Sequence, residues 1–460
     1  MKTTGTAFTG AFVATQMGGE KRAAADGSGP NVLMITCHDI GQHLSCYGVD
    51  SVQTPNLDRL AGRGVRFDNC YSTAPVCSPG RASLFTGRYP QSNGLMGLTH
   101  SPWWWSLHAS ETHLAELLRD AGYETYLVGL SHLGRTAEGL GFEHRLSPQS
   151  DAQETVQETC NLIRNGTNHD KPFYIQAGFR ETHPSSFDYE RRDTEKGLHV
   201  PGWLEPTEAM EEDLAVFQGT IQYFDERVGE ILDALEQSEV RDNTLVIMTS
   251  DHGMGYPGAK WTLRKAGVEV PLILHYPDST LSGGKIFHDV ISNVDVLPTL
   301  FDYLGLEPPG NVEGYSFRQL IDGDTEEGPR REAYSQYTVD MRRNNESRSI
   351  ITERYHLIRY FSQGRAVSYP TGVDPREHRG HVARPSTTGT RPFAQLYDLE
   401  NDPYELQDIG GEEENEAIVA DLSKRLLAWM RDVDDPLLGG PVRQPYYERS
   451  IEDLLEKGDG

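Results

Sequence analysis

The feature that most limits the fold of this chain is a series of continuous apolar runs, each of strand length and each ending at a polar turn. Thr244–Ser250 has the strongest strand character, and Asn31–Cys37 resembles it. Unbroken apolar runs of this length are typical of strands that are buried on both faces of a parallel sheet. Further strands are expected at residues 123–129, 172–179 and 270–277, and a short one at 65–67.

Segments with helical character separate these runs. Residues 54–61 carry a proline at the first helical position, and residues 207–235 begin with acidic side chains, which the helix dipole favours there. Alternation of buried strands with helices predicts an α/β fold, in which a large mixed, mostly parallel sheet is sandwiched by helices. Other helices are expected at 111–121, 152–164 and 295–306.

The chain changes character near residue 328, where charged residues dominate and strands become short. Residues 348–361 and 395–399 predict a small antiparallel sheet, and 412–433 a long helix packed on it. We therefore expect a main domain at 29–330 and a smaller C-terminal α+β subdomain at 331–460, with the boundary near 325–335. The alternative is one continuous domain with a C-terminal extension.

Charge and cysteine content exclude several classes of protein. A formal net charge of −27 disfavours binding to nucleic acid or to an anionic membrane surface. No run approaches the roughly 18 apolar residues of a membrane span. The five cysteines lack zinc-like spacing and do not indicate a disulfide scaffold. Residues 1–28 are expected to be a disordered leader that matches a secretory signal poorly. We expect a cytoplasmic protein, with export by this weak signal as the alternative.

Polar residues that could take part in catalysis or metal binding follow four of the expected strands. Ligands of open α/β sheets bind beyond the carboxyl ends of the strands. One histidine at such a place is an ordinary turn residue, but several together predict a site. The carboxylates suit a hard divalent cation, and the imidazoles also suit Mn²⁺ or Zn²⁺. The residues are His38-Asp39, His132, His183 and Asp251-His252, with Lys260 close enough to reach back as a point charge.

The stretch Cys77-Ser78-Pro79-Gly80-Arg81 precedes a helix-compatible run at 82–85. A buried structural thiol beside a Pro-Gly turn would explain it equally well when it is taken alone. Its place before a helix favours a functional role, because backbone N–H groups and the helix dipole attract an anion there.

This stretch resembles the Cys-x-Pro-x-Arg signature of the formylglycine-dependent sulfatases, members of the alkaline-phosphatase superfamily, and Thr86-Gly87-Arg88 continues it. The resemblance spans about residues 30–410 and implies an alkaline-phosphatase-like fold. In this family the cysteine is oxidised to formylglycine by a formylglycine-generating enzyme. Other matching segments are His38-Asp39-Ile40-Gly41, Gly129-Leu130-Ser131-His132, His183-Pro184, Ser250-Asp251-His252-Gly253 and Lys260.

The resemblance also implies roles for these residues. A divalent metal, Ca²⁺ first with Mn²⁺ or Mg²⁺ as alternatives, would be held by His38, Asp39, Cys77, Asp251 and His252. Catalysis would use formylglycine from Cys77, with Arg81 and Lys260 stabilising the sulfate oxygens. His132 would take a proton from the aldehyde hydrate, and His183 or Lys260 would protonate the leaving group.

Two positions depart from the family pattern. His38 stands where an aspartate is expected, and Leu130 stands where a sulfate-binding lysine is expected, for which Arg135 is a possible substitute. Three functions therefore remain open. The first is a sulfatase acting on a sulfate ester or sulfamate, the second a phosphonate or phosphate ester hydrolase of the same superfamily, and the third a non-catalytic relative that binds sulfated glycans.

Substrate class is indicated by two further segments. Residues 93–98 followed by His100 look somewhat like heparan N-sulfatases. Trp103-Trp104-Trp105 lie in a loop where at least one is expected to line a pocket, since sugar rings stack on such faces. Both favour a sulfated saccharide of the glycosaminoglycan type over a small aryl sulfate. Nothing in the sequence indicates the number of chains that assemble.

Overall fold

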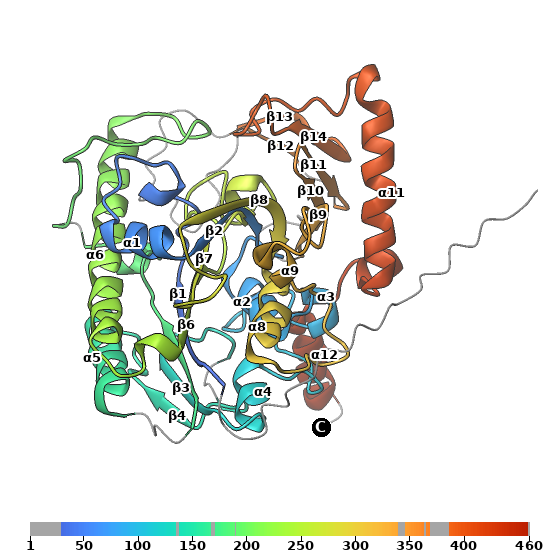
Figure 1. Ribbon diagram of the computed structural model, residues 1–460. Helices are drawn as coiled ribbons and strands as arrows, with labels where there is room; N and C mark the ends of the chain where they lie inside the picture. The colour runs from blue at the N-terminus through green and yellow to red at the C-terminus, as the bar shows by residue number, and fades with distance from the viewer. Residues whose placement is uncertain are drawn as a thin grey trace, which may run out of the picture.

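The computed structural model describes residues 29–134, 138–166, 171–188, 190–338, 346–362, 365–368 and 386–458. The expected leader at 1–28 and Arg135 lie outside them. An eight-stranded sheet forms the centre, with the strand order β4-β3-β5-β1-β6-β7-β2-β8 (Figure 1). Within the described ranges, no helix is both long and apolar enough to cross a membrane.

Most neighbouring strands of this sheet run parallel. The exception is β7, which is antiparallel to both of its neighbours, β6 and β2. The predicted mixed, mostly parallel sheet is therefore confirmed, although the sequence did not show which strand reverses. The strands are β1 (Asn31–Cys37), β2 (Val65–Tyr71), β3 (Glu124–Gly129), β4 (His144–Leu146), β5 (Phe173–Gly178), β6 (Thr244–Ser250), β7 (Leu272–His275) and β8 (Lys285–Ser292).

Side chains of the central strand β1 alternate between two apolar cores. Leu33 and Ile35 belong to the core under α1, α5 and α6, while Val32 and Met34 belong to the core under α2, α4 and α8. Figure 1 shows the two groups of helices on opposite sides of the sheet. The helices are α1 (Pro55–Arg63), α2 (Cys77–Thr86), α3 (Pro90–Asn93), α4 (Leu114–Asp120), α5 (Ala152–Asn161), α6 (Glu208–Glu236), α7 (Lys265–Val268), α8 (Val296–Leu304) and α9 (Arg318–Asp322).

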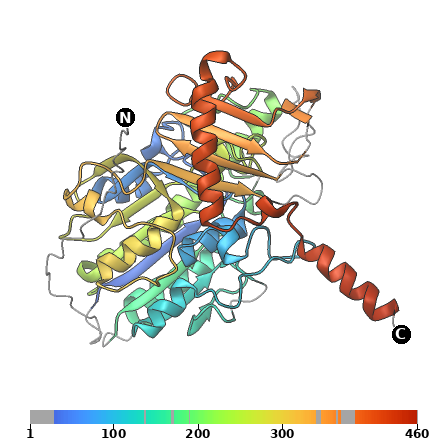
Figure 2. The same cartoon turned by 90° about the vertical axis from the view of Figure 1, so that its right-hand side faces the viewer.

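A second, antiparallel sheet with the order β14-β11-β10-β9 follows in the chain. The long helix α11 (Glu416–Asp432) packs on it, placing Leu426 and Trp429 against Ile350 and Leu357 (Figure 2). The expected small sheet and its covering helix are both present, whereas the exact domain boundary stays a prediction. The strands are β9 (Glu332–Tyr337), β10 (Ser347–Thr352), β11 (Tyr355–Tyr360) and β14 (Ala394–Asp398), and β12 (Arg365–Ser368) pairs with β13 (Ser386–Thr390).

Several elements were not expected from the sequence. Strands β4 and β8 carry exposed charged or polar residues and lie at the two edges of the main sheet, so they lack the apolar pattern of the central strands. The helix expected at 152–164 changes from α to π geometry at Leu162–Gly166. The terminal helix α12 (Pro445–Gly458) projects away from the body of the molecule (Figure 2).

Candidate active site

The pairing of β1 with β6 brings two parts of the site together. The strands are parallel and in register, with Cys37 opposite Ser250, so the residues that follow leave the sheet side by side. His38 Nδ1 lies 2.9 Å from Asp251 Oδ2. The backbone N–H of Asp39 donates to Asp251 Oδ1 at 3.1 Å. Segments separated by more than two hundred residues thus form one polar cluster at the carboxyl edge of the sheet.

The helix α2 begins at Cys77 and passes close to the end of β6. A Cβ atom at Gly80 would lie 2.5 Å from the carbonyl oxygen of Asp251, so a side chain there would push the helix away. The glycine lets Cys77 enter the cluster, where its Sγ lies 3.3 Å from His252 Nε2. Cys77 is 3% exposed. The predicted helix N-terminus is present, but Cys77–Arg81 forms the first turns of the helix and not a turn that precedes it.

Arg81 supplies a fixed positive charge from the same helix. Its guanidinium donates from Nε to Asp251 Oδ2 at 3.2 Å and from Nη2 to the Cys37 carbonyl at 2.8 Å. A third contact joins Nη1 to Thr36 Oγ1 at 3.3 Å. A fully buried guanidinium is stable only when it is paired and hydrogen-bonded in this way. The rigid planar donor set is suited to an oxyanion.

Lys260 supplies the second positive charge from the loop after β6. Its Nζ donates to both carboxylate oxygens of Asp39, at 2.9 and 2.7 Å. The loop is fixed near Cys77, because the N–H of Trp261 donates to the Pro75 carbonyl at 3.1 Å. Burial by itself would raise the pKa of the Asp39 carboxyl, but Lys260 and neighbouring histidines hold that pKa well below its usual range.

His252 is oriented by its own chain. Its Nδ1 lies 2.9 Å from the Gly253 carbonyl and donates to it, which directs Nε2 toward Cys77 and toward Asp39 Oδ1 at 3.0 Å. Burial favours the neutral ring, but Asp251 and Asp39 raise the pKa of His252 to about 9.

The cluster fits a metal ion. One ligand atom from each of its five residues lies within 4.8 Å of all the others, and all five residues are buried. Two carboxylates and two imidazoles form a donor set that divalent cations accept. The hydrogen bond from His252 to Gly253 is the kind of support that fixes a ligating imidazole. The residues are His38, Asp39, Cys77, Asp251 and His252.

Two further histidines line the cluster. The ring of His132 lies 5.3 Å from that of His38, and burial lowers the pKa of His132. His183 Nε2 lies 4.0 Å from Asp39 Oδ2, while its Nδ1 accepts from the Ser185 N–H at 3.2 Å. Burial lowers the pKa of His183 to about 4. The predicted site residues that lie in the described ranges are thus found close together.

Leu130, which stands where the family pattern has a lysine, lies at the end of β3. The N–H of Leu130 donates to the Gly178 carbonyl at 2.8 Å, so the backbone keeps the path of the sheet although the side chain offers no charge. Arg135, the expected substitute, lies outside the described residues. In the described part of the site, the fixed cations are Arg81 and Lys260.

Some supporting residues carried no recognisable sequence signal. Thr182 is uncharged. Its N–H and its Oγ1 both donate to the His38 carbonyl, at 2.8 and 3.0 Å, and so fix the backbone of His38. Ser185 and Thr36 orient His183 and Arg81 in a similar way. Threonine and serine are common in loops, so only the three-dimensional contacts reveal these roles.

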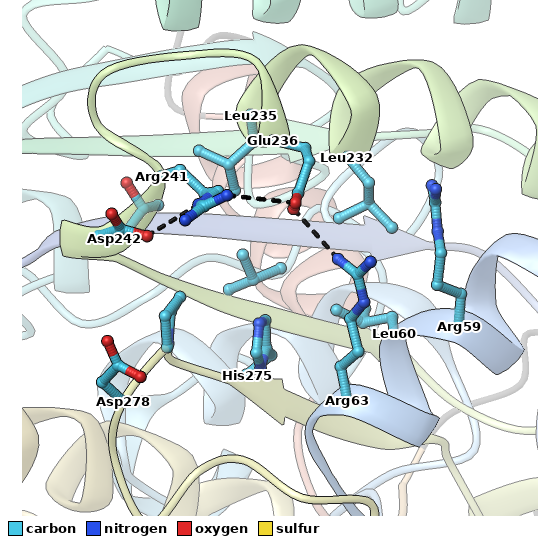
Figure 3. Close-up of a pocket in the computed structure, with 13 residues that line it drawn as sticks. Arg59, Leu60, Arg63, Leu232, Leu235, Glu236, Arg241, Asp242, His275 and Asp278 are labelled. Carbon is cyan, nitrogen blue, oxygen red and sulfur yellow. Dashed lines mark hydrogen bonds and ion pairs between the residues drawn. The ribbon is translucent and has the colours of Figure 1, made fainter.

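A separate cavity of 290 Å³ lies at the opposite edge of the sheet, where β6 begins (Figure 3). Leu60 of α1 and Leu232 of α6 are among the residues that line it. Arg63 and Arg241 both point to Glu236, at 3.0 and 3.3 Å. These charges are paired with each other, and the cavity shares none of the residues of the cluster around Cys77.

Fold and site together define a hydrolase of anionic esters whose residues can hold a metal ion. Comparison with known proteins makes the class specific. Residues 30–306 match the sulfatase family model, and residues 258–392 match the model for the C-terminal region of N-sulphoglucosamine sulphohydrolase. The chain belongs to the sulfatase family, whose members are sulfuric ester hydrolases.

Individual relatives are similar to this chain over most of its length. Arylsulfatase A of Homo sapiens is 30% identical over 436 residues, which cover 83% of this chain and 83% of that protein. N-sulphoglucosamine sulphohydrolase of Homo sapiens is 25% identical over 462 residues, covering 89% and 92%. The solved structure of BT4656 in complex with its substrate D-glucosamine-2-N,6-O-disulfate has the same fold, with a TM-score of 0.69, 20% identity, and coverage of 90% and 99%.

Proposed function

We propose that this protein hydrolyses a sulfate ester or sulfamate on a sulfated saccharide, using formylglycine made from Cys77. The observation that carries the proposal is the position of Cys77 Sγ, at a helix N-terminus and inside a cluster of buried side chains that could hold a metal ion. The saccharide is supported by relatives whose names include N-sulphoglucosamine sulphohydrolase and whose solved structures include a disulfated glucosamine complex.

The cluster would hold one divalent cation through His38, Asp39, Asp251 and His252, together with the group at position 77. We propose Ca²⁺, with Mn²⁺ or Mg²⁺ as alternatives, because the two carboxylates suit a hard cation. Bound there, the metal would act as a Lewis acid on the nucleophile and neutralise part of the charge of the substrate. Formylglycine would supply a hydrated aldehyde as the nucleophile.

The protein's own groups would position and stabilise the sulfate. Arg81 is locked by contacts to β1 and β6 and would present its charge without reorganisation. Lys260 holds Asp39 and would remain cationic beside the substrate oxygens. His132, beside Cys77, would accept a proton from the hydrate. Lys260 or His183 would assist the leaving group: Lys260 as an ammonium that can give up a proton, and His183, at the partly exposed rim, as a neutral ring that donates a hydrogen bond.

Two further properties are proposed with this function. Maturation requires a formylglycine-generating enzyme as a transient partner, since position 77 is a cysteine in the encoded chain. We also propose that the protein acts in the cytoplasm. The five free cysteines, none paired with another, support a reducing compartment.

The test is expression with a formylglycine-generating enzyme, followed by mass analysis of the peptide that contains Cys77. Purified protein is then assayed with 4-nitrophenyl sulfate, 4-nitrophenyl phosphate and N-sulfoglucosamine. We expect converted protein to release sulfate, Cys77→Ala to be inactive, and Cys46→Ser, which changes a thiol outside the cluster, to keep its activity.

Two results would count against the proposal. A phosphatase rate above the sulfatase rate would instead support the phosphate ester hydrolase. Converted protein that binds sulfated saccharides but releases no sulfate would support a binding protein.

A further inference from the structure

We propose that His100 and Trp103 form a saccharide-binding wall at the mouth of the active site. This inference rests on the proposed sulfatase function and adds to it the residues that contact the sugar ring. A short alkyl sulfate, which has no ring, would enter the same site without using this wall.

The first observation is a line of rings that leads from the metal-binding cluster to solvent. The His38 and His132 rings lie 5.3 Å apart, and the His132 and His100 rings are parallel within 1° at 5.8 Å. His38 is buried, whereas His100 is exposed. His100 is therefore separated from the cluster by one imidazole ring and faces the solvent from which a substrate must arrive.

Trp103 extends this wall. Its indole meets the His100 ring edge to face, with centroids 4.9 Å apart and an interplanar angle of 89°. The indole packs on the core beside α4 but stays partly accessible. An indole offers a flat apolar surface for the C–H face of a pyranose, and an imidazole offers a hydrogen bond to a ring hydroxyl or amide. Together they match the two kinds of surface that a sugar presents.

The loop that carries both residues is fixed to the catalytic helix. The N–H of Thr99 donates to Ser78 Oγ, one residue after Cys77, at 3.4 Å. A turn is closed by the N–H of Trp103, which donates to the His100 carbonyl at 2.9 Å. On the far side, Gln336 Nε2 of the second sheet donates to the Met96 carbonyl at 3.3 Å. A wall held in place before binding loses little entropy when a ligand is bound.

The neighbouring tryptophans have other tasks. Trp105 is 7% exposed and belongs to the core. Trp104 stacks on Tyr446 of α12, with ring centroids 5.8 Å apart and an interplanar angle of 8°, and Arg449 lies over the same ring. Trp104 is therefore already in contact with the C-terminal helix, which makes it the matched control for Trp103.

The experiment compares His100→Ala, Trp103→Ala and Trp104→Ala in formylglycine-containing protein. We expect the first two to raise KM for N-sulfoglucosamine or glucosamine 6-sulfate by about tenfold, the effect of losing one stacking or hydrogen-bonding contact. KM for ethyl sulfate, which has no ring to pack on the indole and no hydroxyl or amide to bond to the imidazole, should change by less than about twofold. Trp104→Ala should leave both values unchanged, and His100→Gln should restore part of the saccharide affinity.

Equal changes for both substrates, or no change for either, would overturn the inference. If the wild-type protein hydrolyses ethyl sulfate or 4-nitrophenyl sulfate but neither binds nor hydrolyses the two sugars, the wall is likewise overturned while the sulfatase function stands. If it hydrolyses no sulfate at all, the proposed function fails. The wall is then judged by calorimetric binding of glucosamine 6-sulfate, where equal affinity of wild type and His100→Ala would reject it and weaker binding by the variant would support it.

Discussion

The ammonium group of Lys260 bridges the two carboxylate oxygens of Asp39, and both side chains are almost completely buried. A buried charge costs several kcal/mol unless an opposite charge compensates it, so each of these residues requires the other. The pair also keeps a cation beside the group at position 77, where a sulfate would bind.

Replacement of Lys260 by methionine should therefore impair both activity and stability. We expect kcat/KM for 4-nitrophenyl sulfate to fall by about a hundredfold or more, as for loss of one oxyanion-stabilising group. Without added metal, Tm should also fall, because Asp39 becomes an uncompensated buried charge. Lys285→Met, which changes an exposed lysine of β8, is the control. Activity within threefold of the wild type would show that Lys260 does not face the substrate.

Removal of one carboxylate should weaken metal binding. Asp251 accepts hydrogen bonds from Arg81 and Asp39 and contributes to the five-residue cluster. Because a ligand that binds only the native state raises its stability, addition of Ca²⁺ or Mn²⁺ should raise Tm of the wild-type protein. That rise should be lost in Asp251→Asn but kept in Asp242→Asn, which lies at the remote cavity. An unchanged rise in Asp251→Asn would place the metal elsewhere.

A buried ion pair outside the site should dominate the stability of the C-terminal region. Arg348 donates to Asp435 through two nitrogens, at 2.5 and 2.9 Å, and Gln91 donates to the same carboxylate at 3.0 Å. Asp435→Asn would leave the fully buried guanidinium without its counter-charge, with an expected loss of about 3 kcal/mol in the free energy of unfolding. Urea denaturation of the wild type and the variant measures this loss. The exposed neighbour variant Asp434→Asn should change stability by less than about 0.5 kcal/mol.

Two buried histidines should make the fold sensitive to acid. Burial lowers the pKa of His43 and of His113 to about 3, whereas both rise to the ordinary value of 6.5 on unfolding. Between these values the unfolded chain binds protons that the native chain does not, so stability falls as pH decreases below 6.5. The slope should be about 1.4 kcal/mol per pH unit for each residue.

The variant His113→Asn separates these contributions. His113 Nδ1 accepts from the Ala115 N–H at the start of α4, and asparagine can cap a helix in the same way. Urea midpoints between pH 7.5 and 5 should therefore show a shallower decline for the variant. An identical decline would mean that His113 does not titrate on unfolding.

The central strands could be predicted because their burial on both faces leaves a continuous apolar run, as in Asn31–Cys37 and Thr244–Ser250. Edge strands such as β8 lack this run, and the reversed direction of β7 depends on how the sheet closes rather than on its residues. The sequence analysis did not predict α12, which lies beyond the elements expected for the small sheet and its covering helix.

The identity of the site residues could also be predicted from the sequence. Strand ends predicted His38-Asp39, His132, His183 and Asp251-His252, the spacing after β6 predicted Lys260, and the motif at Cys77 supplied Cys77 and Arg81. The orientation of these groups did not follow, because it depends on Thr182, Ser185 and Gly253, whose contacts join segments distant in the chain or use the backbone alone. The stacking of His100 on His132 also exists only in the folded chain.

The in-register pairing of Cys37 with Ser250 also determines where this chain can change in length. A deletion of one residue within β6 would turn its alternate side chains to the opposite face and move Asp251 by a full step along the strand. Loss of length within β1 would do the same to His38 and Asp39. Insertions, tags and fused domains therefore belong beyond the projecting end of α12 or in outer loops, whereas the two central strands can exchange apolar residues but cannot be lengthened or shortened.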